Sequence, residues 1–487
     1  MGDLKGAHVF SSSAIETMLG RAMGKTLGQA DVAGIIKQGR FNKGVAGLVV
    51  ETSILGYPQD SDRRADLIVD GVPTELKTTG IFRRKTPAPP HFEAKEPMSI
   101  TAVQPETIID EEFESSAMLE KCEHLLMVYY EFLHKVKESS EYADFPLKGY
   151  EFRNLNGDDY RAVQADWTLV RDFIRHSYIA CPENPQSLWP LLSSELNRHK
   201  LSVLDTSPKW PNRPRFRFKR AFVTSFVMDY FGDGLEHLEH GLGILSDLDV
   251  RCGLIAERFR FMAAHEILAE VGIPMPRSPK QVCEVAVTAM FGGRSGKMSR
   301  IEDFRRLSVT GHCVVLNPRG RRTEDFKLND PIDFDEICDP SCDWESSAFR
   351  AMFSDLQLLV PVFREPYDGA PLPEAVFLGF KRPVLPDRIV DGAARACWDE
   401  MRHLVFSGEL RDEVEYRRDG TAIVNASGAV RSAPNWPKSR DFEVFLRGSG
   451  RDANDKPLCV AGVRMYRQNA WIRGSSIAEL LDSTPWL

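Results

Sequence analysis

The sequence lacks the features that would place it in a membrane, in an oxidising compartment or among zinc-thiolate proteins. No apolar run in its 487 residues approaches the ~18–20 residues of a membrane span. Its nine cysteines are scattered singly without a Cys-x-x-Cys pair, which excludes a zinc ribbon and favours reduced thiols. The first residues, Met1 to Lys5, carry no apolar segment of a secretory signal. We therefore expect a cytoplasmic protein with no membrane partner.

The chain also lacks the strong positive charge of many nucleic-acid-binding proteins. Its 62 basic and 70 acidic residues give a formal net charge of −8. That balance does not exclude DNA, because a local basic groove is enough to contact phosphates. Basic residues do cluster at 213–220 and 319–322, whereas 110–114 is acidic. At 43% hydrophobic and 27% charged residues, the composition is that of a globular protein with more than one domain.

Helical and strand patterns alternate in the first eighty residues. Apolar residues at helical spacing predict a helix over 45–55, with Glu51 at the edge of its apolar face. Two short strands, 65–71 and 74–79, are separated by turn residues that include Gly71. This pattern predicts an antiparallel hairpin.

Further along the chain the patterns become less regular. Residues 83–100 are rich in Pro, Lys and Arg and predict a loop. A helix is expected to open at 114–117 and to lead into a buried strand over 125–130. The basic and aromatic stretch 205–220 is punctuated by three prolines, which favours a connection between domains.

An internal duplication indicates how the chain is organised. The run Glu-Ser-Ser-Ala occurs at 114–117 and again at 345–348, each time before an apolar strand. A shift of 237 residues also aligns Lys43 with Lys280, Arg63 with Arg300 and Asp66 with Asp303. We expect two copies of one domain, 1–220 and 221–487.

The second copy lacks charged residues that the first one has. The same shift replaces Glu51 by Thr288, Glu75 by His312 and Lys77 by Val314. A packed core does not need these charges, so their loss predicts that the second copy has no catalytic function.

Asp66, Glu75 and Lys77 form the pattern Asp-x8-Glu-x-Lys over the predicted hairpin. Side chains alternate along a strand, so Glu75 and Lys77 lie on one face about 6.5–7 Å apart. An aspartate on the neighbouring strand can share a divalent cation with Glu75, and hard oxygen ligands suit Mg²⁺. Lys77 can position or help deprotonate a water that attacks a phosphate, and Glu51 can supply a further ligand.

A solvated strand face is the alternative explanation for such alternating charges. An acidic residue two positions before a lysine occurs at Asp3/Lys5, Glu75/Lys77, Glu93/Lys95 and Asp325/Lys327. The pair Glu75/Lys77 differs from the others because it lies on a predicted strand. The strand before it carries Asp66, and the helix before that carries Glu51. This arrangement is the core of the PD-(D/E)xK nuclease architecture.

The stretches 42–51, 64–66 and 74–77 resemble the MutH family, which comprises mismatch-repair nicking enzymes and restriction endonucleases that recognise GATC. Within that family the chain resembles the large two-domain type II restriction enzymes. The similarity continues over most of the chain, in the segments 108–116, 121, 125–130, 215–219, 343–347 and 445–451.

The resemblance implies an α/β fold of two tandem restriction-endonuclease-like domains, each with a central mixed sheet flanked by helices. Residues 1–220 would be the catalytic domain, and 221–487 a catalytically degenerate copy that binds DNA as an effector. Asp66 and Glu75 would be metal ligands supported by Glu51, and Lys77 and Lys121 would be the catalytic lysines.

Five basic residues are candidates for contacts with DNA. They are Lys43, Arg217, Lys219, Arg447 and Arg451. For Lys43, as for Lys121, a solvated helix charge is the alternative, and for Arg447 and Arg451 it is a surface turn. The segment 194–207 contains no glycine, unlike the glycine-rich DNA-contacting loop of relatives that read GATC. The sequence therefore supports the cleavage chemistry better than the target site.

The sequence as a whole predicts a Mg²⁺-dependent endodeoxyribonuclease that cleaves double-stranded DNA at a short, GATC-like site. A type II restriction enzyme is favoured, since a second DNA-binding copy is needless in an enzyme directed by repair partners. The alternatives are a mismatch-repair-type nicking enzyme and a DNA-binding regulator without hydrolysis. A cognate DNA methyltransferase and self-association on DNA are further expectations.

Overall fold

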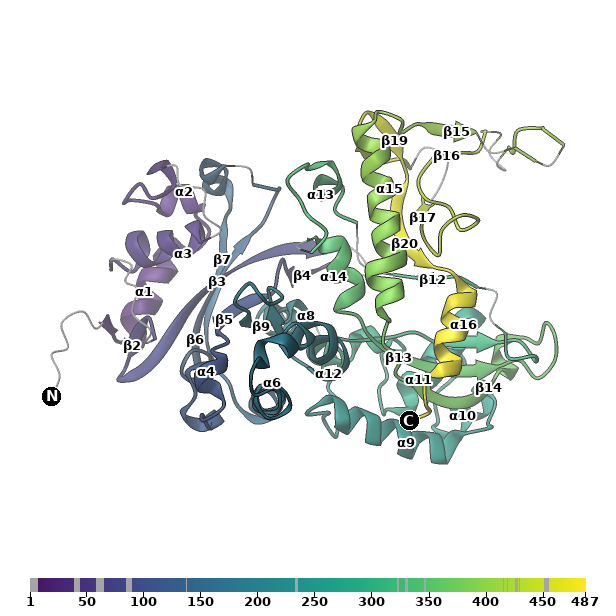
Figure 1. The fold of residues 1–487 in the computed structure, drawn as a ribbon, viewed down its shortest axis with the longest axis horizontal. Helices are drawn as coiled ribbons and strands as arrows, with labels where there is room; N and C mark the ends of the chain where they lie inside the picture. The colour runs from purple at the N-terminus through teal and green to yellow at the C-terminus, as the bar shows by residue number, and fades with distance from the viewer. Residues whose placement is uncertain are drawn as a thin grey trace. The chain divides into compact units, whose positions relative to one another are not determined.

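The computed structural model shows a mixed α/β protein whose chain divides into two compact units (Figure 1). The N-terminal unit is Met1–Asp249 with Gly292–Val309, and the C-terminal unit is Val250–Phe291 with Thr310–Leu487. In the part of the chain that the structure describes, no helix is long and apolar enough to cross a membrane. The described residues are 8–38, 44–57, 65–84, 90–136, 138–232, 235–321, 324–328, 332–345, 347–414, 416–417, 419–424, 428, 430–450 and 455–487.

A mixed sheet forms the centre of the N-terminal unit. Its strands run in the order β1-β2-β3-β6-β7, and β4 pairs with β3. The pairs β1–β2 and β3–β6 are parallel, whereas β2–β3, β3–β4 and β6–β7 are antiparallel. The strands are Val9–Phe10 (β1), Leu67–Val69 (β2), Val72–Arg84 (β3), His91–Ala94 (β4), His124–Glu131 (β6) and Leu147–Asn154 (β7).

Helices cover both faces of this sheet, as the apolar run 125–130 predicts for a central strand. Alternate residues of β6, such as Leu126 and Val128, join one apolar core with the first three helices. The residues between them, such as Met127, join a second core with α6 and α8 (Figure 1). The helices are Ser12–Ala22 (α1), Leu27–Ala30 (α2), Val45–Leu48 (α3), Gly157–Ala180 (α6) and Arg220–Phe231 (α8).

A second sheet of the N-terminal unit corrects two predictions. It contains β5 (Met98–Ala102), β9 (Arg215–Phe218) and β8 (Leu204–Ser207) in that order. The expected loop over 83–100 instead contains the end of β3 and all of β4, which pair with each other, and the start of β5, which pairs with the distant β9. Residues 205–220 contain the hairpin of β8 and β9 inside the unit and do not connect two domains.

The division of the chain also differs from the expected boundary between 1–220 and 221–487. The N-terminal unit continues to Asp249 and includes the later segment Gly292–Val309. Helix α8 follows the expected boundary directly, and its residues Phe222 and Phe226 are buried in the core of the N-terminal unit. The functions expected for the two parts stay predictions.

The C-terminal unit has its own apolar core and its own mixed sheet. In this sheet β11 (Val314–Leu316) is parallel to β13 (Gln357–Arg364), which is antiparallel to β14 (Val376–Lys381). Strand β10 (Val309–Gly311) also pairs with β13, and the pairing of β11, β13 and β14 resembles that of β3, β6 and β7. A separate three-stranded sheet contains β12 (Phe326–Lys327), β20 (Arg467–Ile472) and β17 (Val444–Ser449). The main helices are Ala264–Glu270 (α10), Val282–Met290 (α11), Ala348–Ser354 (α14), Arg395–Phe406 (α15) and Gly474–Ser483 (α16).

A buried aspartate shapes the part of the N-terminal unit that was compared with the DNA-contacting loop. Asp166, on α6, accepts hydrogen bonds of 2.8–2.9 Å from the backbone N–H groups of Ser202, Val203 and Leu204. Burial raises the pKa of Asp166 to about 6, against the opposing charge of Lys219 and these hydrogen bonds. The carboxylate therefore anchors the start of β8 to α6.

We predict that Asp166→Ala destabilises the protein by about 3–5 kcal/mol, because three buried N–H groups lose their acceptor and a buried charge pair is broken. Urea unfolding measures the effect. Asp158→Ala is the matched control on the same helix, since Asp158 is exposed and pairs with Arg161 at the surface. Its expected cost is below about 1 kcal/mol. Equal destabilisation by the two variants would contradict the anchoring role.

Candidate active site

The hairpin of β2 and β3 places Asp66 and Glu75 at its open end. Asp70 and Gly71 form the two-residue turn with φ values of 49° and 85°, as a type I′ turn requires. Leu67 pairs with Thr74, so Asp66, one residue earlier, comes opposite Glu75. The hairpin prediction is confirmed. Asp66 itself precedes β2 rather than lying within it, because its carboxylate accepts the N–H of Leu76 at 3.0 Å.

Asp66 lies in an environment that disfavours its negative charge. Burial raises its pKa, the nearby charge of Glu75 raises it further, and Lys121 and Lys77 oppose the shift. Its backbone carbonyl accepts a hydrogen bond of 3.0 Å from Nδ1 of His8, whose ring stacks on Tyr57. Two carboxylates held close together repel each other, and nearby positive charges reduce this repulsion.

Two lysines supply positive charge by pairing with Glu75. Its Oε1 accepts a hydrogen bond from Nζ of Lys77, and its Oε2 accepts one from Nζ of Lys121, both at 2.9 Å. The side chain of Glu75 is 5% exposed, against 18% for Lys77 and 14% for Lys121. A buried carboxylate flanked by two ammonium groups is therefore the electrostatic centre of the site.

The parallel pairing of β3 with β6 brings Lys121 to Glu75. Lys121 is the C-cap of the short helix α5 (Ala117–Glu120), which Ser116 caps at its other end. Strand β6 begins three residues later, and its Leu125 pairs with Glu75. The helix expected at 114–117 and the strand expected at 125–130 are confirmed.

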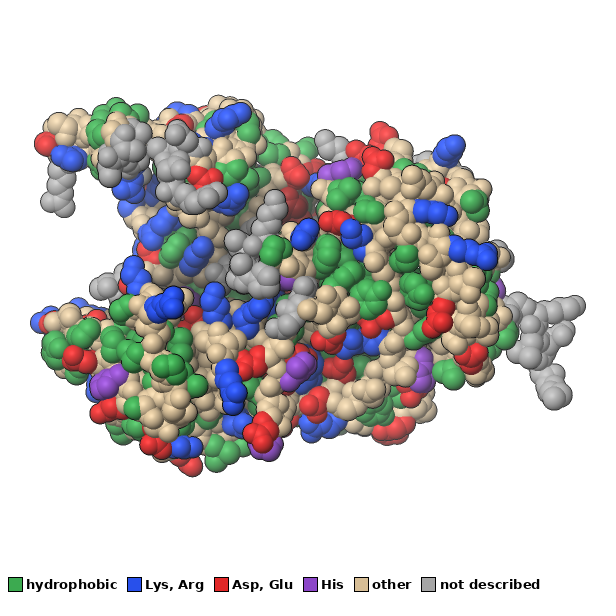
Figure 2. All heavy atoms as spheres, turned by 180° about the vertical axis from the view of Figure 1, so that it is seen from behind, with side chains coloured by type: hydrophobic (Ala, Val, Ile, Leu, Met, Phe, Trp, Pro, Cys, Tyr) green, Lys and Arg blue, Asp and Glu red, His purple; other side chains and the backbone are tan. Residues whose placement is uncertain are grey.

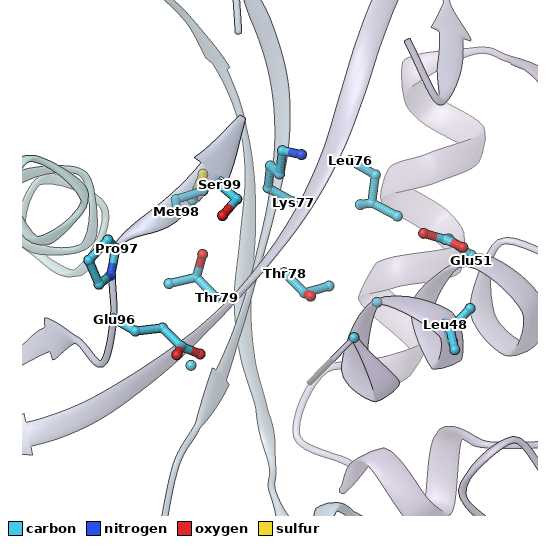
Figure 3. Close-up of a pocket in the computed structure, with 13 residues that line it drawn as sticks. Leu48, Glu51, Leu76, Lys77, Thr78, Thr79, Glu96, Pro97, Met98 and Ser99 are labelled. Carbon is cyan, nitrogen blue, oxygen red and sulfur yellow. The ribbon is translucent and has the colours of Figure 1, made fainter. Parts of the chain in front are cut away.

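Glu51 lies on a helix with an irregular turn. The predicted helix over 45–55 is present as α3 followed by a π-helical segment, η2 (Val49–Ile54), which contains Glu51. π-helical turns occur often at functional sites. Glu51 and Lys77 both line a pocket of about 280 Å³. Figure 3 shows Glu51 on one side of β3 and Pro97, Met98 and Ser99 on the other.

The pocket also contains polar residues that sequence reasoning missed. Thr79 lines it from β3, and Glu96 and Ser99 line it from the start of β5 and the turn before it (Figure 3). Thr79 could have been found by extending the alternation from Glu75 and Lys77 by one step. Glu96 and Ser99 gave no local signal, because the segment was expected to be a loop.

The donor set determines which metal the site suits. Among the described residues there is no cluster of three or more His, Cys, Asp or Glu side chains arranged to hold a metal ion. Asp66 and Glu75 offer two carboxylates beside two lysines. A pair of carboxylates fits Mg²⁺, which keeps several waters and binds proteins through one or two carboxylates.

In the C-terminal unit, the residues that the 237-residue shift aligns with Glu51, Glu75 and Lys77 make different contacts. Thr288 is fully buried in α11, and its hydroxyl donates to the carbonyl of Glu284. The ring of His312 lies 4.4 Å from that of Phe326, and Val314 is fully buried. The three residues thus make buried, backbone and aromatic contacts and form no charged cluster.

The predicted DNA contacts in the N-terminal unit lie in different surroundings. Arg217 makes two hydrogen bonds of 2.7 and 3.0 Å to the carboxylate of Asp205. Lys219 is 4% exposed and donates to backbone carbonyls, including that of Leu201. A buried ammonium with internal acceptors has a structural role, so we no longer count Lys219 among the DNA contacts. Lys43 lies outside the described residues.

The predicted contact Arg447 lies on the solvent-facing side of the β12-β20-β17 sheet. It pairs with Asp325 at 2.7 Å, and its guanidinium lies 4.6 Å from the ring centroid of Trp471. By the antiparallel register, Arg467 and Lys327 share this face. Figure 2 shows Lys and Arg side chains around a hollow on this part of the C-terminal unit. Arg451 lies outside the described residues.

Comparisons with known proteins agree with the geometry of the site. Residues 55–150 match the family model described as "DNA mismatch repair enzyme MutH". This stretch contains Asp66, Glu75, Lys77 and Lys121. The chain is also 21% identical over 488 aligned positions to the type II restriction enzyme Sau3AI of Staphylococcus aureus. The alignment covers 97% of this chain and 91% of that protein. The resemblance predicted from the sequence is thus confirmed: residues 55–150 match the MutH family model, and the chain is similar along nearly its whole length to a type II restriction enzyme.

Proposed function

We propose that this protein is a type II restriction endonuclease that hydrolyses phosphodiester bonds of double-stranded DNA with the help of a divalent metal ion. One observation carries the proposal: Asp66, Glu75, Lys77 and Lys121 converge at the open end of a hairpin within the MutH-like stretch. The similarity to Sau3AI over both units favours restriction over partner-directed nicking.

Asp66 and Glu75 would hold the metal ion, with Glu51 as a supporting acid. A bound Mg²⁺ supplies charge stabilisation at the phosphate and acidifies a bound water. Lys77 and Lys121, which now donate to Glu75, would turn toward the phosphate oxygens and the attacking water once the carboxylate has another positive partner. Burial around Glu75 strengthens each of these electrostatic interactions.

The two units would divide the work of binding and cleavage. The matching order of strand pairing supports two tandem copies of one nuclease fold, the second without a catalytic set. The solvent-facing side of the β12-β20-β17 sheet combines arginines with an aromatic ring, a composition that suits phosphate and base contacts. We propose that this face binds DNA.

The target and partners follow from the family resemblance. We propose a short site of the GATC kind, a DNA methyltransferase that protects the host sites, and association of two copies of the chain on DNA. A regulator that binds without cleaving is the weaker candidate, because it would have no use for a buried Glu75 with two lysines.

We predict that Glu75→Ala and Lys77→Ala lower the single-turnover cleavage rate of duplex DNA by about 10²–10⁴-fold or more, because each removes part of the metal and water activation. DNA affinity should stay within about tenfold of the wild type, since these residues act mainly in the transition state.

Lys148→Ala is the matched control for Lys77→Ala. Lys148 pairs with Glu131 at 3.0 Å in the same unit, so this variant also loses one lysine from an ion pair. It should cleave at a rate near that of the wild type. Near-normal cleavage by both active-site variants, or wild-type cleavage that persists in EDTA, would refute the proposed mechanism.

We predict that Arg447→Ala combined with Arg467→Ala weakens DNA binding of the full chain. Each lost phosphate contact should lower the slope of log affinity against log salt by about one. Fluorescence anisotropy on a Lys77→Ala background measures affinity without cleavage. Arg395→Ala removes a comparably exposed arginine from α15 and serves as the control. An unchanged salt dependence in the double variant would contradict a DNA-binding role for this face.

A further inference from the structure

The segment Gly292–Val309 belongs to the N-terminal unit although the chain reaches it only after a stretch of the C-terminal unit. It contains helix α12 (Glu302–Arg306), which packs against α8. Phe304 and Leu307 are fully buried, so the segment contributes to the folded core of the unit. The N-terminal unit is therefore completed by residues distant in sequence from its nuclease motif.

Arg305 of this segment pairs with a buried carboxylate on β4. Its Nη1 lies 3.2 Å from Oε1 of Glu93, a side chain that is 4% exposed. The same carboxylate accepts hydrogen bonds from Nε of Arg84 at 3.0 Å and from Nε2 of His91 at 3.1 Å. Arg84 and His91 are paired neighbours on β3 and β4, whereas Arg305 is 212 residues away from Glu93.

The charge of Glu93 depends on these partners. Burial by itself raises the pKa of Glu93, but the hydrogen bond from His91 and the charges of Arg84 and Arg305 outweigh it and hold the pKa well below its usual range. The carboxylate thus stays ionised in the interior and orients the donors around it. Loss of one cationic partner from such a buried cluster is costly.

Strand β4 leads from Glu93 directly into a wall of the pocket that Lys77 and Glu51 also line. The N–H of Ala94 donates to the hydroxyl of Thr224 at 3.1 Å, and the N–H of Lys95 donates to the carbonyl of Gly80 at 2.8 Å. The next residues, Glu96 to Ser99, line the pocket together with Gly80, Lys77 and Thr79. In Figure 3 they form the side of the pocket opposite Glu51. The position of this wall is thus set within a few residues of the Arg305–Glu93 pair.

We infer that Arg305 is a positioning residue of the nuclease: by pairing with Glu93, it fixes the wall formed by residues 96–99 against which the DNA substrate must fit. The inference rests on the proposed nuclease function. It implies that a chain truncated after Asp249 keeps Asp66, Glu75, Lys77 and Lys121 but lacks the residue that holds this wall in place.

The test compares full-length Arg305→Ala and Arg305→Lys with the wild type. Arg294→Ala is the matched control, because Arg294 is an exposed arginine of the same segment. Hydrogen exchange of the backbone amides of residues 94–99 reports on the wall, and single-turnover cleavage reports on the reaction. In Arg305→Ala these amides should exchange faster, and cleavage should fall by about 10–10²-fold, as expected for a reacting group displaced from its substrate.

Arg305→Lys should recover part of both properties, because an ammonium keeps the charge but not the fork geometry. The control should match the wild type in both measurements. Amide exchange and cleavage of Arg305→Ala equal to those of the control would overturn the inference. A wild type that does not cleave DNA would refute the proposed function, while the exchange of residues 94–99 would still show whether Arg305 holds the wall.

If Arg305→Ala fails to fold, the combination of Arg305→Gln and Glu93→Gln removes both charges and avoids an unpaired buried carboxylate. Faster exchange of residues 94–99 in this folded variant, with slower cleavage, supports the inference. Exchange and cleavage equal to those of the wild type overturn it.

Discussion

The active site of the N-terminal unit depends on holding one carboxylate, Glu75, in a largely buried position. An unpaired charge at this position would strongly destabilise the protein, so the fold has to place positive groups beside it. Lys77 comes from two residues along the same strand, and Lys121 comes from the turn before β6. Lys121 can reach Glu75 only if β3 and β6 are parallel and in the observed register. The chemistry of the site therefore depends on the order and register of these strands.

The features that could be predicted from the sequence are those encoded by near neighbours. The hairpin and the Asp66/Glu75/Lys77 set follow from strand alternation and a two-residue turn. Lys121 was found through resemblance, because its link to Glu75 depends on strand pairing. Strand β5 and the Arg305–Glu93 pair could not be predicted, since their partners lie far away in the sequence. Strand β4 was missed although it pairs with the neighbouring end of β3, because the prolines and basic residues of 83–100 favour a loop. The unit boundary was misplaced for a similar reason: the chain returns to the N-terminal unit at Gly292.

The C-terminal unit shows what the same order of strand pairing looks like without the charged cluster. Thr288, His312 and Val314 stand where the duplication predicts Glu51, Glu75 and Lys77, and they are held by apolar and backbone contacts. Two of its exposed arginines, Arg447 and Arg467, lie on the β12-β20-β17 sheet, where the guanidinium of Arg447 packs against the ring of Trp471.

The most direct test of the central claim is an experimental structure of the protein with duplex DNA and Mn²⁺, with the metal located by its anomalous scattering. The account predicts a metal peak within about 2.0–2.6 Å of carboxylate oxygens of both Asp66 and Glu75. It also predicts that Lys77 or Lys121 has moved from Glu75 to the scissile phosphate or its attacking water. A metal bound elsewhere, with Glu75 still paired to both lysines in a DNA-bound pocket, would contradict it.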